Sequence, residues 1–259
     1  MNGRVFWYTG FTGAFKIYLN SNFLSIVIAC NLRGRIVQKK QFFTNSCGAA
    51  SLLCVAHELG VRHLPNINVM GSMSHGQALA ATNNCESAIY QITSGSTTGQ
   101  IPHGNHLSTA DYSMPDKMVF AARLLDLDAQ IYLESGAFAS ALGKLYSSTV
   151  EKCEQSGVPI HRTAPPQMGA FERMIKIVGV LKVVGLHYVM KRPDGTYMDP
   201  GDGQNFPDFD QMNNSWLKCY SDTGISIVFK RQANNSAIAK QALKDFSRRK
   251  SGQSHEAPF

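Results

Sequence analysis

The sequence lacks long hydrophobic runs. None approaches the roughly 20 consecutive apolar residues that a membrane-spanning helix needs, so no transmembrane segment is expected. The nearest candidate for a secretion signal, Phe23–Ala29, is only seven residues long and follows Asn20-Ser21-Asn22 instead of a basic start. We interpret it as a buried strand and do not expect lipoprotein-type processing at Cys30. The protein is therefore expected in the cytoplasm, or exported by a route without a cleaved signal peptide.

Cysteine and charge are also scarce. The six cysteines among 259 residues include no Cys-x-x-Cys pair, and if one is catalytic an odd number remains, so no disulfide framework is expected. Charged residues make up 17% of the chain against 44% hydrophobic residues, which is typical of a globular protein with a real core. The net charge of +7 suggests affinity for something acidic. Lys and Arg are scattered along the chain, however, so no specific nucleic-acid binding is expected.

Cofactor and metal sites have no firm motif. The polar stretch Ser94–His106 lacks the Lys of a phosphate-binding P-loop. His103 and His106 could join His75 or Cys85 around zinc, but no pair of ligands has a characteristic spacing. We therefore expect no cofactor and no metal.

Composition divides the chain into three parts. Residues 1–40 alternate aromatic and β-branched runs with Gly and Asn, and are expected to form an N-terminal extension of short strands packed on the main domain. Residues 41–231 are expected to form that domain. Residues 232–259 are polar and predict one helix followed by a disordered tail. Nothing in the sequence indicates an oligomeric state.

The stretch Gln41–Cys54, QFFTNSCGAASLLC, places a thiol at the expected start of an apolar helix over residues 48–59. Asn45 or Ser46 can cap this helix by accepting hydrogen bonds from its first N–H groups. Cys47 would then lie at the positive end of the helix dipole, which favours the thiolate. Because the thiolate is the reactive form, Cys47 is a candidate nucleophile.

A nucleophilic thiol needs a base, a group that orients the base, and donors for the developing oxyanion. His187 lies near the start of an apolar strand, and Asp199 closes the strand that returns after the Asp194-Gly195 turn. Such a hairpin can bring imidazole and carboxylate side by side, where the carboxylate fixes the tautomer and stabilises imidazolium. Gln41 could join the backbone N–H of Cys47 as an oxyanion donor.

These residues resemble the papain-like cysteine peptidases, in which Gln, five residues and Cys-Gly-x-Ala stand at a helix start. The Gly-Val-Pro, Gly-x-His-Tyr-Val and Asp-Gly…Asp-Pro segments that follow are similar to the double-glycine branch, which matures bacteriocin precursors. The resemblance spans Gln41 to Asp199. It implies an α+β fold in which the helix bearing the Cys packs on an antiparallel sheet carrying His and Asp. It also implies cleavage of a peptide or protein amide bond through an acyl-enzyme, with Cys47 as nucleophile, His187 as base, Asp199 as orienter and Gln41 as oxyanion donor.

Alternatives stay open at this point. The 139 residues between Cys47 and His187 are more than expected for the minimal bacteriocin-processing domain. Relatives of this fold include side-chain deamidases, transglutaminase-like enzymes and acyltransferases, some of them bacterial toxins or effectors, and all use the same thioester chemistry. A non-catalytic binding protein on this fold is a third possibility. Asn214, which stands before Ser-Trp, is a rival to Asp199 because the original papain branch orients its His with such an Asn.

The remaining elements are expected from local patterns. Ser113 to Asp116 reads as a capping box that starts a helix ending near Leu127. A second helix is expected over residues 135–155. Residues 171–184 are apolar and ambiguous between helix and strand, and residues 224–230 are expected to form a last strand.

Overall fold

The structure is a computed structural model that describes residues 5–10, 13–18, 36–64, 76–95, 107, 110–136, 140, 147–180, 185–215 and 218–231. The chain divides into two compact units, Met1–Ile36 and Val37–Phe259. In the first unit, β1 (Val5–Gly10) and β2 (Gly13–Tyr18) form an antiparallel hairpin, while the strand expected at Phe23–Ala29 lies outside the described residues. Among the described residues, no helix has the length and apolar character needed to cross a membrane.

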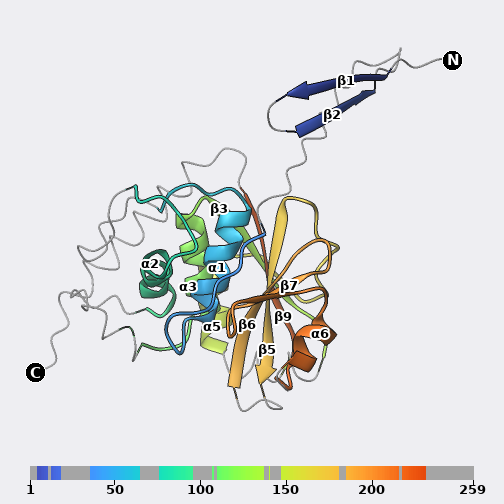
Figure 1. Cartoon of the computed structure of the whole chain (residues 1–259). Coiled ribbons are helices and arrows are strands. Elements are labelled where there is room, and N and C mark those ends of the chain that lie inside the picture. The colour runs from blue at the N-terminus through green and yellow to red at the C-terminus, as the bar shows by residue number, and fades with distance from the viewer. Residues whose placement is uncertain are drawn as a thin grey trace, which may run out of the picture. The chain divides into compact units, whose positions relative to one another are not determined.

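The second unit is built on a seven-stranded sheet with the order β4-β3-β9-β5-β6-β7-β8 (Figure 1). Its described strands pair antiparallel, except that β3 and β4 are parallel. The α+β expectation is therefore confirmed, and the expectation of a purely antiparallel sheet fails at one edge. A helix, α5, lies between β3 and β4 in the sequence, which is the connection that a parallel pair requires. The strands are β3 (Leu127–Leu133), β4 (Ile160–His161), β5 (Glu172–Val180), β6 (Gly185–Lys191), β7 (Tyr197–Asp199), β8 (Gln204–Phe206) and β9 (Ser221–Arg231).

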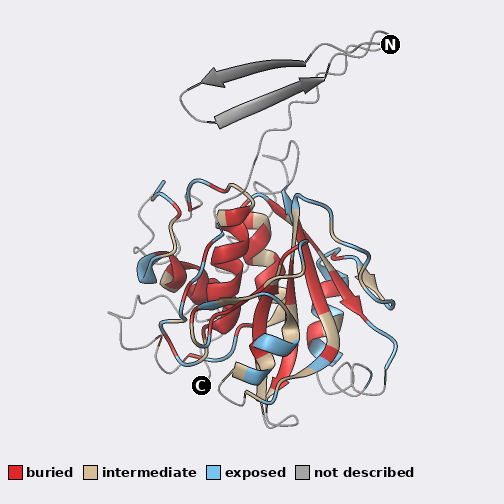
Figure 2. Cartoon of the chain, turned by 45° about the vertical axis from the view of Figure 1, so that its right-hand side comes forward, coloured by how far each residue is buried: buried red, intermediate tan, exposed pale blue. Residues whose placement is uncertain are grey.

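Helices cover both faces of this sheet. One face carries α1 (Cys47–Glu58), α2 (Asn83–Thr93), α3 (Pro115–Leu124) and α5 (Ser147–Gln155), and the other carries α6 (Phe209–Asn214) (Figure 1). α1 contacts β5, β6, α2 and α3, and nearly all its residues are buried (Figure 2). The apolar, many-sided pattern of this helix thus predicted its central place correctly. Close packing begins at its first turn, since a Cβ on Gly48 would lie 2.5 Å from the Cβ of Ser113.

Two expectations about α3, its C-terminal end and its N-cap, are wrong. α3 ends at Leu124, and Asp126 then adopts a left-handed φ of 57°, which turns the chain into β3. β3 alternates buried and half-buried residues at its start because it pairs with the long strand β9. Ser113 does not cap α3, because its hydroxyl hydrogen-bonds with that of Thr93 at 2.8 Å and Pro115 begins the helix after Met114.

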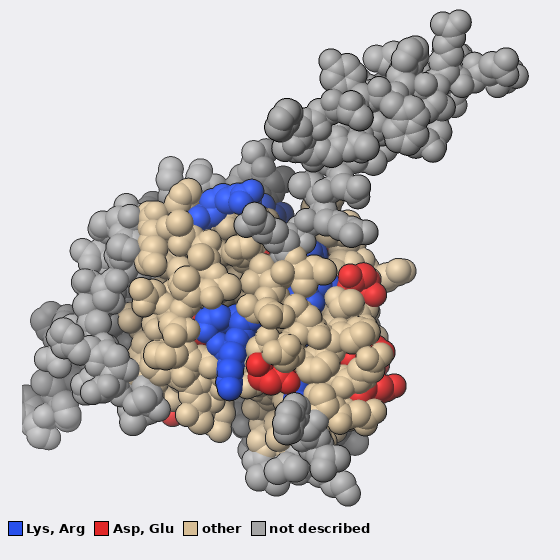
Figure 3. Space-filling view, viewed as in Figure 1, with Lys and Arg blue, Asp and Glu red and all other residues tan. Residues whose placement is uncertain are grey.

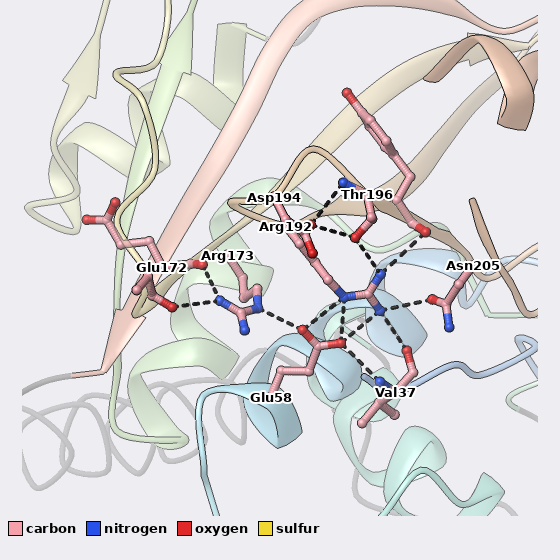
Figure 4. Close-up of polar contacts among 10 residues, drawn as sticks. Val37, Glu58, Glu172, Arg173, Arg192, Asp194, Thr196 and Asn205 are labelled. Carbon is pink, nitrogen blue, oxygen red and sulfur yellow. Dashed lines mark hydrogen bonds and ion pairs between the residues drawn. The ribbon is translucent and has the colours of Figure 1, made fainter. Parts of the chain in front are cut away.

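A buried charge cluster ties the C-terminal end of α1 to the β6–β7 hairpin (Figure 4). The carboxylate of Glu58 accepts hydrogen bonds from Nε of Arg192 at 2.8 Å and from Nε of Arg173 at 2.7 Å. Nη2 of Arg192 also donates to the carbonyl of Val37 and to Oδ1 of Asn205, both at 2.9 Å. The cluster therefore fixes α1 against β6, the helix and the strand that carry the candidate thiol and imidazole at their other ends.

Candidate active site

The β6–β7 hairpin places His187 beside Asp199. The two strands pair through Met190 and Met198, and continuing this register puts Gly201 opposite His187. Asp199 lies two residues before Gly201, so its side chain shares the face of the hairpin that carries His187. Nε2 of His187 is 2.7 Å from Oδ1 of Asp199. The absence of a side chain at Gly201 matters here, because a Cβ would lie 3.1 Å from Oδ1 of Asp199 and 3.5 Å from Nε2 of His187.

Four donors surround the Asp199 carboxylate, which is fully buried. Oδ1 accepts from the backbone N–H of Gly201 at 2.7 Å, in addition to its contact with His187. Oδ2 accepts from Nζ of Lys218 at 2.6 Å and from the hydroxyl of Tyr220 at 3.0 Å. An ionised carboxylate offers about four lone-pair sites, so every one of them is occupied.

The protonation states follow from these contacts. Burial raises the pKa of Asp199, but hydrogen bonds from His187, Lys218 and Gly201 outweigh it and hold this pKa well below its usual range. Asp199 is therefore an acceptor only, so Nε2 of His187 carries the shared hydrogen and Nδ1 is the nitrogen available to the thiol. Burial lowers the pKa of His187, but hydrogen bonds with Asp199 and Cys47 raise it to about 9. Imidazolium is thus the favoured form at neutral pH.

Cys47 is the first residue of α1, as the sequence predicted, and its interaction with His187 helps to raise the pKa of the imidazole. It differs in this polar surrounding from two other buried cysteines, Cys54 and Cys153. Burial, followed by the charge of Glu58, raises the pKa of Cys54 to about 12, and burial also raises the pKa of Cys153 to about 12. Both are structural thiols, whereas Cys47 lies at a helix N-terminus beside a cationic imidazole.

The loop before Cys47 is held by a buried carboxylate and not by capping. Ser46 occupies the N-cap position, yet its side chain makes no cap hydrogen bond, and Oγ instead donates to Oε1 of Glu86 at 2.6 Å. Nδ2 of Asn45 donates to the carbonyl of Ala110. The capping expectation is therefore wrong for both residues. Glu86 also accepts from the backbone N–H of Phe42 at 2.7 Å, so it fixes the loop that delivers the thiol.

Gln41 lies in the same loop, joined to the residue after Asp199. Its backbone N–H donates to the carbonyl of Pro200 at 2.8 Å. Its side-chain Nε2 donates to the carbonyls of Phe43 at 3.0 Å and Thr44 at 2.7 Å, while Oε1 is buried without a hydrogen-bond partner in the described structure. The amide thus supports the loop in this conformation, and its role as an oxyanion donor stays a prediction.

Sequence comparison identifies the relatives of this chain. Residues 39–232 match the family described as invasion plasmid antigen J, cysteine protease. The cysteine protease IpaJ of Shigella flexneri is 38% identical over 213 residues, which cover 78% of this chain and 82% of that protein. This chain belongs to the IpaJ cysteine protease family. It is therefore a cysteine protease, as the thiol chemistry of the sequence predicted. No solved structure matches it.

The region shared with the IpaJ family includes every residue of the candidate site. Asn214, the rival orienter, ends α6, and among the described contacts the partner of the imidazole is the Asp199 carboxylate. Within the described residues no group of three His, Cys, Asp or Glu side chains is arranged to hold a metal. His75, His103 and His106 lie outside those residues.

Sequence reasoning missed three groups of the candidate site: Lys218, Tyr220 and Glu86. Lys218 and Tyr220 precede β9 and reach Asp199 only because the chain returns through β8 and α6. Glu86 comes from α2 and reaches the loop before α1. A single Lys in a polar loop carries no local signal of such a role. The near-repeat Asp199-Pro200-Gly201-Asp202-Gly203 was the available hint, since two carboxylates close together call for a nearby cation.

Proposed function

We propose that the protein cleaves peptide bonds through a papain-like triad in which Cys47 is the nucleophile, His187 the base and Asp199 the orienter. The observation that carries the proposal is the 2.7 Å contact between Nε2 of His187 and Oδ1 of Asp199, which leaves Nδ1 for the thiol at the start of α1. The interaction with Cys47, which helps to raise the pKa of His187, supports the same arrangement. The nearer resemblance to the double-glycine branch stays a prediction.

The chemistry follows from these positions. With the thiol proton already held by His187 as imidazolium, the Cys47 thiolate attacks the scissile carbonyl carbon to form a tetrahedral oxyanion. The imidazolium then protonates the leaving amine as the C–N bond breaks, which leaves a thioester on Cys47. Water, deprotonated by His187, attacks the thioester and releases the acid and the free thiol. Asp199 stabilises imidazolium in both halves of the reaction without itself being protonated.

Stabilisation of the oxyanion requires N–H donors near Cys47. As the first residue of α1, Cys47 has a backbone N–H with no partner inside the helix. We propose that this group is one donor. Gln41, which lies in the loop that leads to Cys47, supplies the second oxyanion donor. For this, its side-chain amide must release one of the two loop carbonyls when substrate binds.

The first test measures thiol reactivity in the native protein. Wild-type protein is alkylated with iodoacetamide at pH 6.5, and the labelled cysteines are mapped by mass spectrometry. We expect Cys47 to react much faster than Cys54 and Cys153, whose pKa values are raised to about 12. Equal rates for the three thiols would remove the thiolate argument. His187→Ala is expected to abolish the preference for Cys47.

The second test identifies the bond that is broken. Wild type and Cys47→Ala are incubated with candidate peptides and proteins, and the products are weighed. New termini that appear only with wild type support proteolysis, whereas a shift of about 1 Da without cleavage would indicate side-chain deamidation by the same triad. The expected partner is a peptide or protein substrate, encountered in the cytoplasm or after export without a cleaved signal peptide.

A further inference from the structure

We propose that Lys218 and Tyr220 are positioning residues of the triad, which hold Asp199 through Oδ2 so that Oδ1 is presented to His187. The inference rests on the proposed function, since it assigns a role to groups that touch the orienter and neither the thiol nor the substrate. Lys218 is the principal member, and Tyr220 contributes a second hydrogen bond to the same oxygen.

The geometry of the Asp199 carboxylate supports this role for Lys218 and Tyr220. The two oxygens of the carboxylate are chemically equivalent, so its donors fix the plane of the group, in which one oxygen lies 2.7 Å from Nε2 of His187. Gly201 and His187 occupy Oδ1, while Lys218 and Tyr220 occupy Oδ2, so the present orientation satisfies all four sites at once. Loss of a donor on Oδ2 leaves a buried lone pair unpaired and weakens the restraint on the plane of the carboxylate.

Lys218 is itself held in place from three sides. Its Nζ lies 2.6 Å from Oδ2 of Asp202 as well as from Oδ2 of Asp199, and 4.5 Å from the ring centroid of Phe206. The side chain is 10% exposed, so this cation is almost withdrawn from water. A buried Lys with two carboxylates is costly to desolvate, and this Lys lies where its charge stabilises the ionised form of the orienter.

The backbone between Lys218 and Tyr220 is not a regular strand, yet both side chains reach Asp199. In a regular strand, Lys218 and Tyr220 would share one face, with Cys219 between them on the other. Cys219 instead adopts a left-handed φ of 51°, which bends the chain before β9. The Tyr220 ring stacks on the His187 ring with centroids 5.5 Å apart while its hydroxyl reaches Asp199. Burial and the charge of Asp199 raise the pKa of Tyr220, so this hydroxyl remains a donor.

The charges near the imidazole make the role visible in a pH profile. Cys47, Asp199 and Tyr220 face His187 directly, and Lys218 and Asp202 lie one contact further away. Without Lys218, Asp199 and Asp202 repel each other, and the cationic environment of the Cys47 thiolate is weaker. Both effects weaken the pairing of Cys47 with the imidazolium, so alkylation of Cys47 is expected to require a higher pH.

The test follows site-resolved alkylation of Cys47 from pH 5 to 9 in Lys218→Met, Lys218→Arg and Tyr220→Phe. Matched controls come from the same sheet. Lys230→Met deletes a half-exposed cation that pairs with Asp128, and Tyr132→Phe deletes a hydroxyl from a ring that stacks on His161. Folding of each variant is checked by circular dichroism.

We expect Lys218→Met to lower the alkylation rate at pH 6.5 about tenfold and to raise the pH midpoint by roughly one unit. Tyr220→Phe moves both quantities in the same direction by a smaller amount, about threefold in rate. Lys218→Arg recovers most of the loss, and both controls match wild type. A folded Lys218→Met with the wild-type midpoint overturns the inference; if that variant does not fold, an unchanged profile in Tyr220→Phe does so. A wild type without preferential Cys47 alkylation instead refutes the proposed function, and the two failures are thereby distinguished.

Discussion

Replacement of Glu58 by Gln tests how the fold holds α1 against the sheet. The side chains of Glu58 and Arg192 are 1% and 3% exposed, and Arg173 is the second cation at the same carboxylate (Figure 4). Gln keeps the size of the side chain and an acceptor for the backbone N–H of Val37, but it removes the charge. Two guanidinium groups then lose the carboxylate with which they pair in a buried site.

The expected cost is large for one substitution. Breaking a buried ion pair by removal of one partner costs about 3–5 kcal/mol, and the retained acceptor places Glu58→Gln near the lower end, at about 3 kcal/mol. This is a substantial share of the roughly 5–15 kcal/mol that stabilises a typical domain. With a urea dependence of about 2–3 kcal/mol per molar, the unfolding midpoint should fall by roughly 1 M.

Urea unfolding followed by fluorescence or circular dichroism provides the measurement. Glu154→Gln is the matched control, because Glu154 approaches Arg162 at only 4.0 Å and both side chains are more than half exposed. Such surface pairs contribute about 0–1 kcal/mol, so this variant should remain within that range of wild type. If Glu58→Gln unfolds at the same urea concentration as Glu154→Gln, the cluster does not hold the helix and the reasoning is refuted.

Three further predictions concern the site and the loops around it. The first concerns pH: the raised His187 pKa of about 9 contributes stability that is fully present below pH 6.5 and is lost as the pH rises through 9. The free energy of unfolding should therefore fall by about 2 kcal/mol between pH 6 and 9 in wild type. The fall should be clearly smaller in Asp199→Asn. Gly203→Ala should destabilise the protein more than Gly195→Ala does. Both glycines have positive φ, but of the two only Gly203 would place a Cβ against backbone, 2.6 Å from the N atom of Lys40. Equal urea midpoints for the two variants would contradict this packing argument. Gln41→Ala should lower kcat for peptide cleavage about 100-fold. The rate of Cys47 alkylation should stay within a fewfold of wild type, because alkylation forms no oxyanion. Parallel losses in both assays would show that Gln41 only supports the loop.

The placement of charge on the surface gives no separate indication of a partner. On the face seen in Figure 3, the described Lys and Arg side chains form separate groups, and acidic side chains lie close to one of them. This agrees with the scattered basic residues in the sequence. The chemistry of the protein therefore has to be understood from the buried polar contacts of its second unit.

Local sequence patterns predicted the elements whose stability depends on near neighbours. α1 was recognisable because its apolar residues face all directions and Cys47 stands at its start. The β6–β7 hairpin was recognisable because the Asp194-Gly195 turn lies between two apolar runs, and Gly195 indeed has a positive φ of 89°. β3 was missed because residues 127–133 follow a strong helix pattern, and only pairing with the distant β9 stabilises them as a strand.

The sequence by itself determined which groups are candidates for the reaction: a thiol at a helix start and a His and an Asp twelve residues apart in a hairpin. That spacing works because a tight turn pairs residues close in the chain, so the His187–Asp199 contact needs no distant element. Only the tertiary structure decided what surrounds this pair. Lys218, Tyr220 and Glu86 arrive from other elements, and their effect on Asp199 and on the loop before Cys47 depends on burial. A charge acquires such influence only when folding removes it from water.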